Sequence, residues 1–155
     1  MIYHQHLIIT AHVRQPFVDP EVTKDWLKRL VAAINMKICK SGGPHVDYVE
    51  AEGNCGIAGV VMIETSHISI HCWDKQDPPL AQIDVYSCNK YDNELVLSFV
   101  EEMDPIAIEW LLLDRQTNIF VPDPNVNIRI YHPDGSVIKD TMSLNFSNNT
   151  TPVPK

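Results

Sequence analysis

The chain has 155 residues, of which 45% are apolar and 21% charged, the balance of one soluble globular domain with a sizeable core. The 20 acidic residues outnumber the 12 basic ones, for a formal net charge of −8. That sign repels phosphate backbones and argues against nucleic acid as a partner. The sequence shows no secretory leader pattern and no apolar run of membrane-spanning length, so we expect a cytoplasmic protein with no membrane partner.

Four cysteines are spread along the chain and form no Cys-X-X-Cys pair. In a reducing compartment we expect all four to be free thiols. A mixed zinc site can be drawn from His67, His71, Cys72 and Cys88, but its spacing matches no familiar zinc pattern. No metal site is therefore predicted.

The first part of the chain predicts strands around one helix. Residues 3–13 have the pattern of an opening strand. Asp19-Pro20 is a helix start, with Asp as the N-cap and Pro at the first helical position. Helical spacing then predicts one buried face, formed by Val22, Trp26, Leu27, Leu30, Val31 and Ile34. After it we expect a short strand at 36–39, a loop over 45–56 and a buried strand at 57–63.

The middle of the chain predicts a hairpin followed by a second helix. Strands at 66–73 and 81–88 flank a polar, proline-bearing turn and are expected to pair. The helix spans residues 92–103, with Leu95, Val96, Phe99 and Val100 facing inward.

The last part predicts more strands. One covers 106–113, with Glu109 facing solvent or a partner. Two shorter strands, at 127–132 and 136–138, flank the turn Pro133-Asp134-Gly135. Adjacent hairpins without repeated crossover units predict an α+β two-layer sandwich, a mainly antiparallel sheet with helices on one face. We expect a single domain over residues 1–146 and a disordered tail over 147–155.

One segment, residues 59–73, places hydroxyls, two histidines and a carboxylate inside an apolar strand pattern. Burying so many polar groups is costly unless they have a use. Ser66 and His71 are five residues apart, so a regular strand would point them to opposite faces of the sheet. The chain must therefore kink near Ser66 if both serve one site. A strained serine peptide suits an N→O acyl shift, in which the hydroxyl attacks the preceding carbonyl and β-elimination then leaves a pyruvoyl group.

Two motifs resemble the prokaryotic S-adenosylmethionine decarboxylases: Ser66-His-Ile-Ser-Ile-His71 with Trp73, and Ala81-Gln-Ile-Asp84-Val-Tyr-Ser-Cys88. Gly59-Val60-Val61 and His6-Leu7 fit as well, and the resemblance is close over 57–89 and loose over the first 115 residues. It implies cleavage between Thr65 and Ser66, with Ser66 becoming the pyruvoyl cofactor. It also implies that His71 assists elimination, that Cys88 protonates the product, and that the protein is a homodimer or higher homo-oligomer.

The sequence departs from this family at two positions used in self-processing. The family usually has Glu where Thr65 precedes the serine, and it often has a serine in place of Ala58. That missing hydroxyl takes part in processing in the family. His67, by contrast, is expected to make only a structural hydrogen bond.

Two further departures concern the ligand. Glu52 stands where the family has an aromatic residue that stacks on adenine, and Lys75 stands where it has a Glu that holds the ribose hydroxyls. A lysine accepts no hydrogen bonds. The predicted substrate-binding residues are therefore Trp73 as a stacking surface, Asp74 after a one-residue shift, and Glu64.

The sequence thus predicts a pyruvoyl-dependent decarboxylase of polyamine metabolism, with S-adenosylmethionine as the default small-molecule substrate. A cationic amino acid, arginine or ornithine, is an alternative that suits the acidic surplus. A further alternative is an uncleaved homologue that binds a nucleoside, an amino acid or a partner enzyme. Ala58 and Thr65 favour this alternative.

Overall fold

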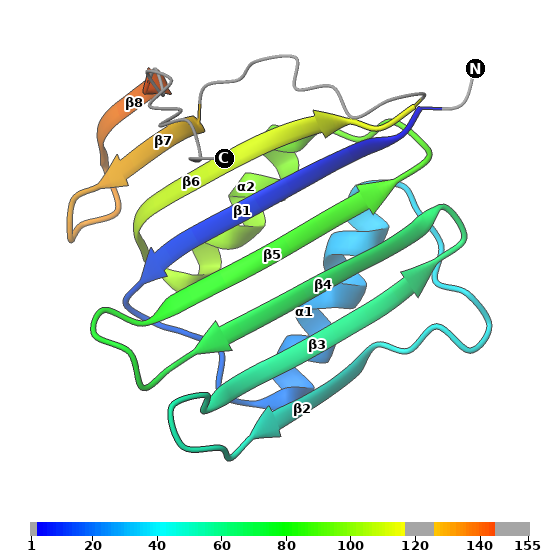
Figure 1. Cartoon of the computed structure of the whole chain (residues 1–155), viewed down its shortest axis with the longest axis horizontal. Coiled ribbons are helices and arrows are strands. Elements are labelled where there is room, and N and C mark those ends of the chain that lie inside the picture. Colours follow the sequence, from blue (N-terminus) through cyan, green and yellow to red (C-terminus); the bar gives the residue numbers. More distant parts are fainter. Residues whose placement is uncertain (1–2, 117–125, 145–155) are drawn as a thin grey trace, which may run out of the picture.

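The computed structural model describes residues 3–116 and 126–144, and these form one sheet with two helices against one of its faces (Figure 1). The strands are β1 (Gln5–Val13), β2 (His45–Val49), β3 (Gly56–Ile63), β4 (Ser66–Trp73), β5 (Leu80–Ser87), β6 (Pro105–Asp114), β7 (Val126–Tyr131) and β8 (Val137–Leu144). The helices are α1 (Pro20–Ala33) and α2 (Asn93–Val100), the latter followed by the 3-10 turn η1 (Glu101–Met103). The predicted α+β two-layer sandwich is confirmed.

Every strand pairs antiparallel with its neighbours, in the order β2-β3-β4-β5-β1-β6-β7-β8. On the central strand β1, alternate residues are fully buried and face the helices: Leu7, Ile9, Ala11 and Val13. Because side chains alternate along a strand, the residues between them point to the side without helices. We call that side the open face.

Helix α1 begins where the sequence predicts, because the Asp19 carboxylate accepts hydrogen bonds from two N–H groups of the first turn, at 2.8 and 3.4 Å. Trp26 is fully buried, and its indole N–H donates to the carbonyl of Phe99 in α2 at 3.0 Å. The predicted buried face is wrong at Val22, which is 51% exposed. Thr23 is buried instead, and its hydroxyl donates to the Asp19 carbonyl.

Two predictions before β3 are wrong. Residues 36–39 form no strand, only a single bridge between Ile38 and Ile63. Part of the predicted loop over 45–56 is instead β2, which pairs with β3 at the edge of the sheet. Its one buried side chain is Val46, which is flanked by the exposed His45 and Asp47. Charged residues of this kind are typical of edge strands.

The later elements agree more closely with the sequence. β4 pairs with β5 over the predicted hairpin, and β7 pairs with β8 around the predicted turn. In α2 the buried residues are Val96, Leu97 and Val100, so Leu97 was missed, while Leu95 and Phe99 are half-buried. Glu109 is exposed, as expected. The predicted tail lies outside the described residues, and none of the described helices is long and apolar enough to cross a membrane.

Candidate functional site

The junction between β3 and β4 is a tight hairpin turn formed by Glu64 and Thr65. Ser66 opens β4 directly after this turn and pairs with Ile63. Its φ angle is +145°, in a backbone region that residues other than glycine rarely adopt. Such a backbone conformation costs on the order of 1–3 kcal/mol and persists only where the surrounding structure holds it. The kink expected at Ser66 is therefore present.

The carbonyl group of Thr65, which precedes this serine, is held by the neighbouring strand. The backbone N–H of Cys88, just after β5, donates to the Thr65 oxygen at 2.9 Å. The Thr65 hydroxyl donates to Met36 Sδ at 3.1 Å, which fixes the other side of the same residue. An N–H aimed at a carbonyl oxygen stabilises negative charge that develops there during attack on the carbonyl carbon.

The hydroxyl of Ser66 also has a defined partner. Its Oγ lies 3.2 Å from Nδ1 of His67. His67 alternates with the core residue Ile68 and so points to the open face. Regular alternation along β4 would point the Ser66 side chain toward the helices. The irregular backbone at Ser66 instead directs its hydroxyl toward the open face.

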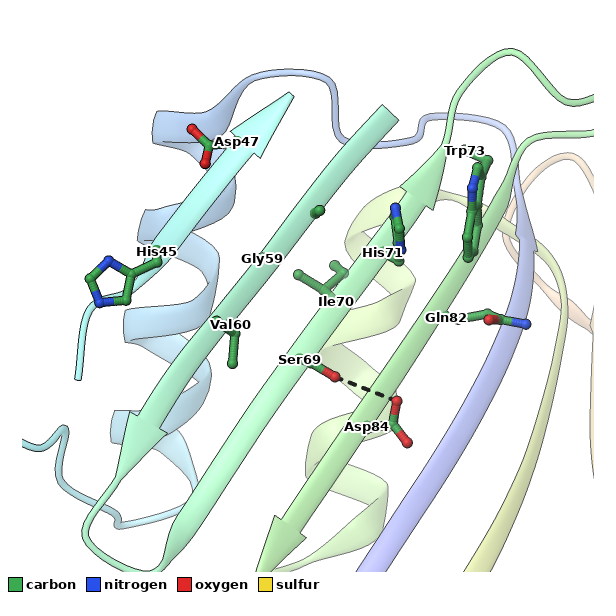
Figure 2. A pocket seen from close by; sticks show the side chains of 11 residues that line it. His45, Asp47, Gly59, Val60, Ser69, Ile70, His71, Trp73, Gln82 and Asp84 are labelled. Carbon is green, nitrogen blue, oxygen red and sulfur yellow. Dashed lines mark hydrogen bonds between the residues drawn. The ribbon is translucent and has the colours of Figure 1, made fainter. Parts of the chain in front are cut away.

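A groove of about 470 Å³ crosses the open face over β2, β3, β4 and β5 (Figure 2). Its polar and aromatic lining includes His45, Asp47, Ser69, His71, Trp73 and Asp84. The His71 and Trp73 rings stack with centroids 4.1 Å apart and an interplanar angle of 19°. Nε2 of His71 is buried and has no hydrogen-bond partner among the described residues. Burial lowers the pKa of His71, which favours the neutral imidazole.

Asp84 connects the groove to the central strand β1 by hydrogen bonds. Its carboxylate lies 3.0 Å from Nε2 of His6 on β1 and accepts a hydrogen bond from the Ser69 hydroxyl at 3.4 Å. Arg115 donates to Nδ1 of His6 at 3.3 Å, which leaves the proton of the neutral ring on Nε2, facing Asp84. Burial lowers the pKa of His6 and outweighs the opposing effect of Asp84.

The predicted catalytic residues fall into two groups. Thr65, Ser66 and Cys88 meet at the junction, whereas His71 lies in the groove. Ser66 and His71 are five positions apart along β4, which at about 3.3 Å per residue is roughly 16 Å. Neither Ser66 nor Cys88 lines the groove. A single chain therefore brings Cys88 to the serine and leaves His71 remote from it.

Of the three predicted substrate-binding residues, only Trp73 lines the groove, where its indole N–H donates to Asn54 at 2.7 Å. The Asp74 side chain is 6% exposed and lies outside the groove. It accepts hydrogen bonds from the Tyr48 hydroxyl at 2.9 and 3.1 Å and pairs with Lys75 at 3.0 Å. Glu64 is exposed in the turn, at the opposite end of β4.

Sequence reasoning missed five polar groove residues: His45, Asp47, Ser69, Gln82 and Asp84. The alternation along β4 and β5 contains the signal, because Ser69, His71 and Trp73 share one face and Asp84 pairs directly with Ser69. Asp47 and His45 were hidden because their strand was read as a loop.

All four cysteines are free thiols. The four residues of the conceivable zinc site are separated, since Cys72 faces the helices while His67 and His71 face the other side. Burial raises the pKa of Cys72 to about 12, so this thiol stays protonated. Within residues 3–116 and 126–144, no group of three or more His, Cys, Asp or Glu side chains is arranged to hold a metal ion.

Fold and junction together define a two-layer α+β domain with a strained serine at a hairpin turn, the class of protein that the sequence motifs indicate. The chain belongs to the S-adenosylmethionine decarboxylase family, whose family model matches residues 5–115. The resemblance read from the motifs is thereby confirmed. The matched region ends before β7, so the β7–β8 hairpin lies beyond it.

Individual relatives are distant. The chain is 34% identical over 87 residues to the S-adenosylmethionine decarboxylase proenzyme of Pyrococcus furiosus. The aligned region covers 54% of this chain and only 60% of that protein. It is 27% identical over 114 residues to the proenzyme of Archaeoglobus fulgidus, covering 72% and 86%. The crystal structure of the adenosylmethionine decarboxylase from Aquifex aeolicus matches with a TM-score of 0.57 over 80% of this chain and 98% of that one. At 22% identity, this last likeness is one of fold.

Proposed function

We propose that this chain is a self-cleaving, pyruvoyl-dependent decarboxylase that cuts its own backbone between Thr65 and Ser66. One observation carries the proposal: Ser66 has a φ of +145°, and the carbonyl before it accepts the Cys88 N–H at 2.9 Å. A strained serine next to a polarised carbonyl is suited to attack by its own hydroxyl. Membership of a family whose relatives are named proenzymes gives further support.

The residues around Ser66 fit a pyruvoyl group at that position. Such a group supplies a carbonyl that draws electrons while an amino acid loses carbon dioxide. Cys88 is partly exposed beside the junction, and we assign its thiol the role of proton donor to the product carbon. His71, whose buried Nε2 has no hydrogen-bond partner within residues 3–116 and 126–144 and whose lowered pKa favours the neutral ring, is assigned to the elimination step that follows the acyl shift.

Because Ser66 and His71 are remote within one chain, we propose that the working site is completed in a homodimer. The open face is suited to this, since it exposes Ile8, Val60 and Met62 at 36%, 39% and 51%. In a symmetric dimer the open face of one copy packs against the open face of the other. If the two-fold axis passes between the groove and the junction, the groove of each copy lies opposite the junction of its partner. The partner's His71 then acts on Ser66.

S-adenosylmethionine, the substrate named for the relatives, is the first candidate substrate, in a role in polyamine biosynthesis. A cationic amino acid such as arginine or ornithine is the second, for a specific reason. The carboxylate of Asp74 is engaged by Tyr48 and Lys75, so it is not free for ribose hydroxyls. The groove instead presents the exposed carboxylate of Asp47, which suits a positively charged ligand, whereas the Asp84 carboxylate is engaged by His6 and Ser69.

The test compares purified wild-type protein with Ser66→Ala. A carbonyl reagent such as phenylhydrazine should label the fragment that begins at residue 66 of the wild type and leave the variant unlabelled. Carbon dioxide release from S-adenosylmethionine, arginine and ornithine then identifies the substrate. An uncut chain with no hydrazine-reactive carbonyl would overturn the enzyme proposal and leave a binding homologue. Asp47→Asn should raise KM for a cationic amino acid, since that carboxylate contacts the charge.

A further inference from the structure

A histidine that the chemistry above leaves unused lies beside the reacting hydroxyl. Nδ1 of His67 is 3.2 Å from Ser66 Oγ, within hydrogen-bond distance. In the neutral tautomer with its proton on Nε2, the ring accepts at Nδ1, so the Ser66 hydroxyl donates to it. Among residues 3–116 and 126–144, no other hydrogen bond engages this imidazole.

The surroundings of His67 hold its ring in place without competing for Nδ1. Its cross-strand partner on β5 is Tyr86, and the two rings meet edge to face with centroids 5.8 Å apart. Tyr86 is in turn fixed by the Arg115 guanidinium, which lies 4.5 Å from its ring centroid, and by His6 at 5.4 Å. On β3 the partner of His67 is the apolar Met62. The imidazole is therefore positioned by packing, and in the described part of the chain its hydrogen-bond partner is the serine.

We propose that His67 is the catalytic base of the N→O acyl shift, an inference that rests on the self-cleavage proposed above. Ser66 Oγ forms a bond to the Thr65 carbonyl carbon while its proton passes to Nδ1 of His67. The negative charge on the Thr65 oxygen is stabilised by the Cys88 N–H. The bond from that carbon to the Ser66 nitrogen then breaks, and the proton on Nδ1 moves to the nitrogen. The product is an ester with a free amine, with no atom gained or lost.

The position of His71 supports assigning the acyl shift to His67 and the later elimination to His71. His71 is roughly 16 Å along the strand from Ser66, at about 3.3 Å per residue, whereas His67 is in contact with it. The acyl shift therefore needs only groups of one chain, namely Ser66, His67 and the Cys88 amide. The later elimination is the step for which the partner's His71 is required.

The experiment follows self-cleavage of the freshly made, full-length chain by intact mass in the wild type, His67→Ala, His67→Asn and His71→Ala. His67→Asn keeps a hydrogen-bond acceptor near the serine but has no proton-accepting nitrogen. Both His67 variants should cleave at least about 100-fold more slowly than wild type, as expected for loss of a general base. Added imidazole should restore part of the rate in His67→Ala. His132→Ala, at an exposed histidine in the β7–β8 turn, is the matched control and should cleave normally.

Neutral hydroxylamine separates the two histidines, because it cuts esters and spares amides. His71→Ala should accumulate the ester and be cut at residue 66, whereas His67→Ala should remain an amide and resist. If the wild type cleaves and His67→Ala cleaves equally fast, or is cut by hydroxylamine like His71→Ala, then His67 is not the base and self-cleavage still stands. If the wild type never cleaves, the proposed function fails and the role of His67 fails with it.

Discussion

Ala58 and His71 are direct cross-strand partners on β3 and β4, and both line the groove. Nε2 of His71 is buried without a hydrogen-bond partner in the described part of the chain. The position of Ala58 is the one at which the family often carries a serine. The structure thus pairs the lost hydroxyl with the ring nitrogen that lacks a partner.

Ala58→Ser should therefore accelerate self-cleavage. A serine opposite His71 lies close enough to reach its ring, since paired Cβ atoms are about 4.5–5.5 Å apart. A hydrogen bond of about 1 kcal/mol corresponds to about a fivefold faster rate. The rate is measured by intact mass against time. Ala107→Ser, on the same face of β6, is the control and should change nothing; equal rates in Ala58→Ser and wild type would contradict the assignment of His71.

Mixing two inactive variants should restore cleavage if each site uses two copies. Ser66→Ala and His71→Ala should each stay uncleaved when prepared alone. After co-expression, the chain with intact Ser66 can receive the partner's His71 and should be cut. Its fragments are identified by the mass of alanine at position 71. Mixed dimers seen by native mass spectrometry with no such fragments would show that His71 does not act across the dimer.

A charge placed on the open face should separate the dimer. Met62 and Val22 are both 51% exposed but lie on opposite sides of the fold, Met62 on the open face and Val22 on α1. Met62→Lys should therefore give a monomer in sedimentation experiments, because a lysine ammonium is costly to bury in an interface. Val22→Lys should keep the mass of the parent protein. If both variants sediment alike, the open face is not the interface.

Stability should fall in mildly acidic solution because of the half-buried imidazoles of His71 and His6. Burial lowers the pKa values of His71 and His6 in the folded protein, so the unfolded chain binds protons more readily. Their contribution is fully present above about pH 6.5, the pKa of an unfolded histidine, and is lost as the pH falls below it. Urea unfolding of the Ser66→Ala protein between pH 7.5 and 5 should show this loss. Adding His71→Phe, which preserves an aromatic surface against Trp73, should make the slope smaller; an unchanged slope would contradict the role of His71.

Local signals in the sequence predicted much of the fold. Asp19-Pro20 marked the start of α1, and the Pro133-Asp134-Gly135 turn marked the β7–β8 hairpin, because caps and tight turns depend on a few neighbouring residues. β2 was missed because an edge strand needs only one buried side chain, here Val46, and its charged residues look like a loop.

The sequence predicted the site only in part, because the site also depends on contacts between residues far apart in the chain. The motif singled out Ser66, and parity along the strand called for a kink there if Ser66 and His71 serve one site; the backbone is irregular at Ser66, but His71 stays remote from it within the chain. The sequence could not show that the kink turns the hydroxyl toward His67 and leaves His71 far away, since that depends on the hairpin turn and on the register of β4 against β5. Likewise, Asp74 looked free for a ligand because its contact with Tyr48 joins residues 26 apart in the chain.

The most direct test of the account is the intact mass of the purified full-length protein. Self-cleavage predicts two fragments, one ending at Thr65 and one beginning at residue 66 with its amine replaced by a carbonyl, and Ser66→Ala should give neither. A wild-type protein whose mass equals that of the uncut chain would contradict the central claim.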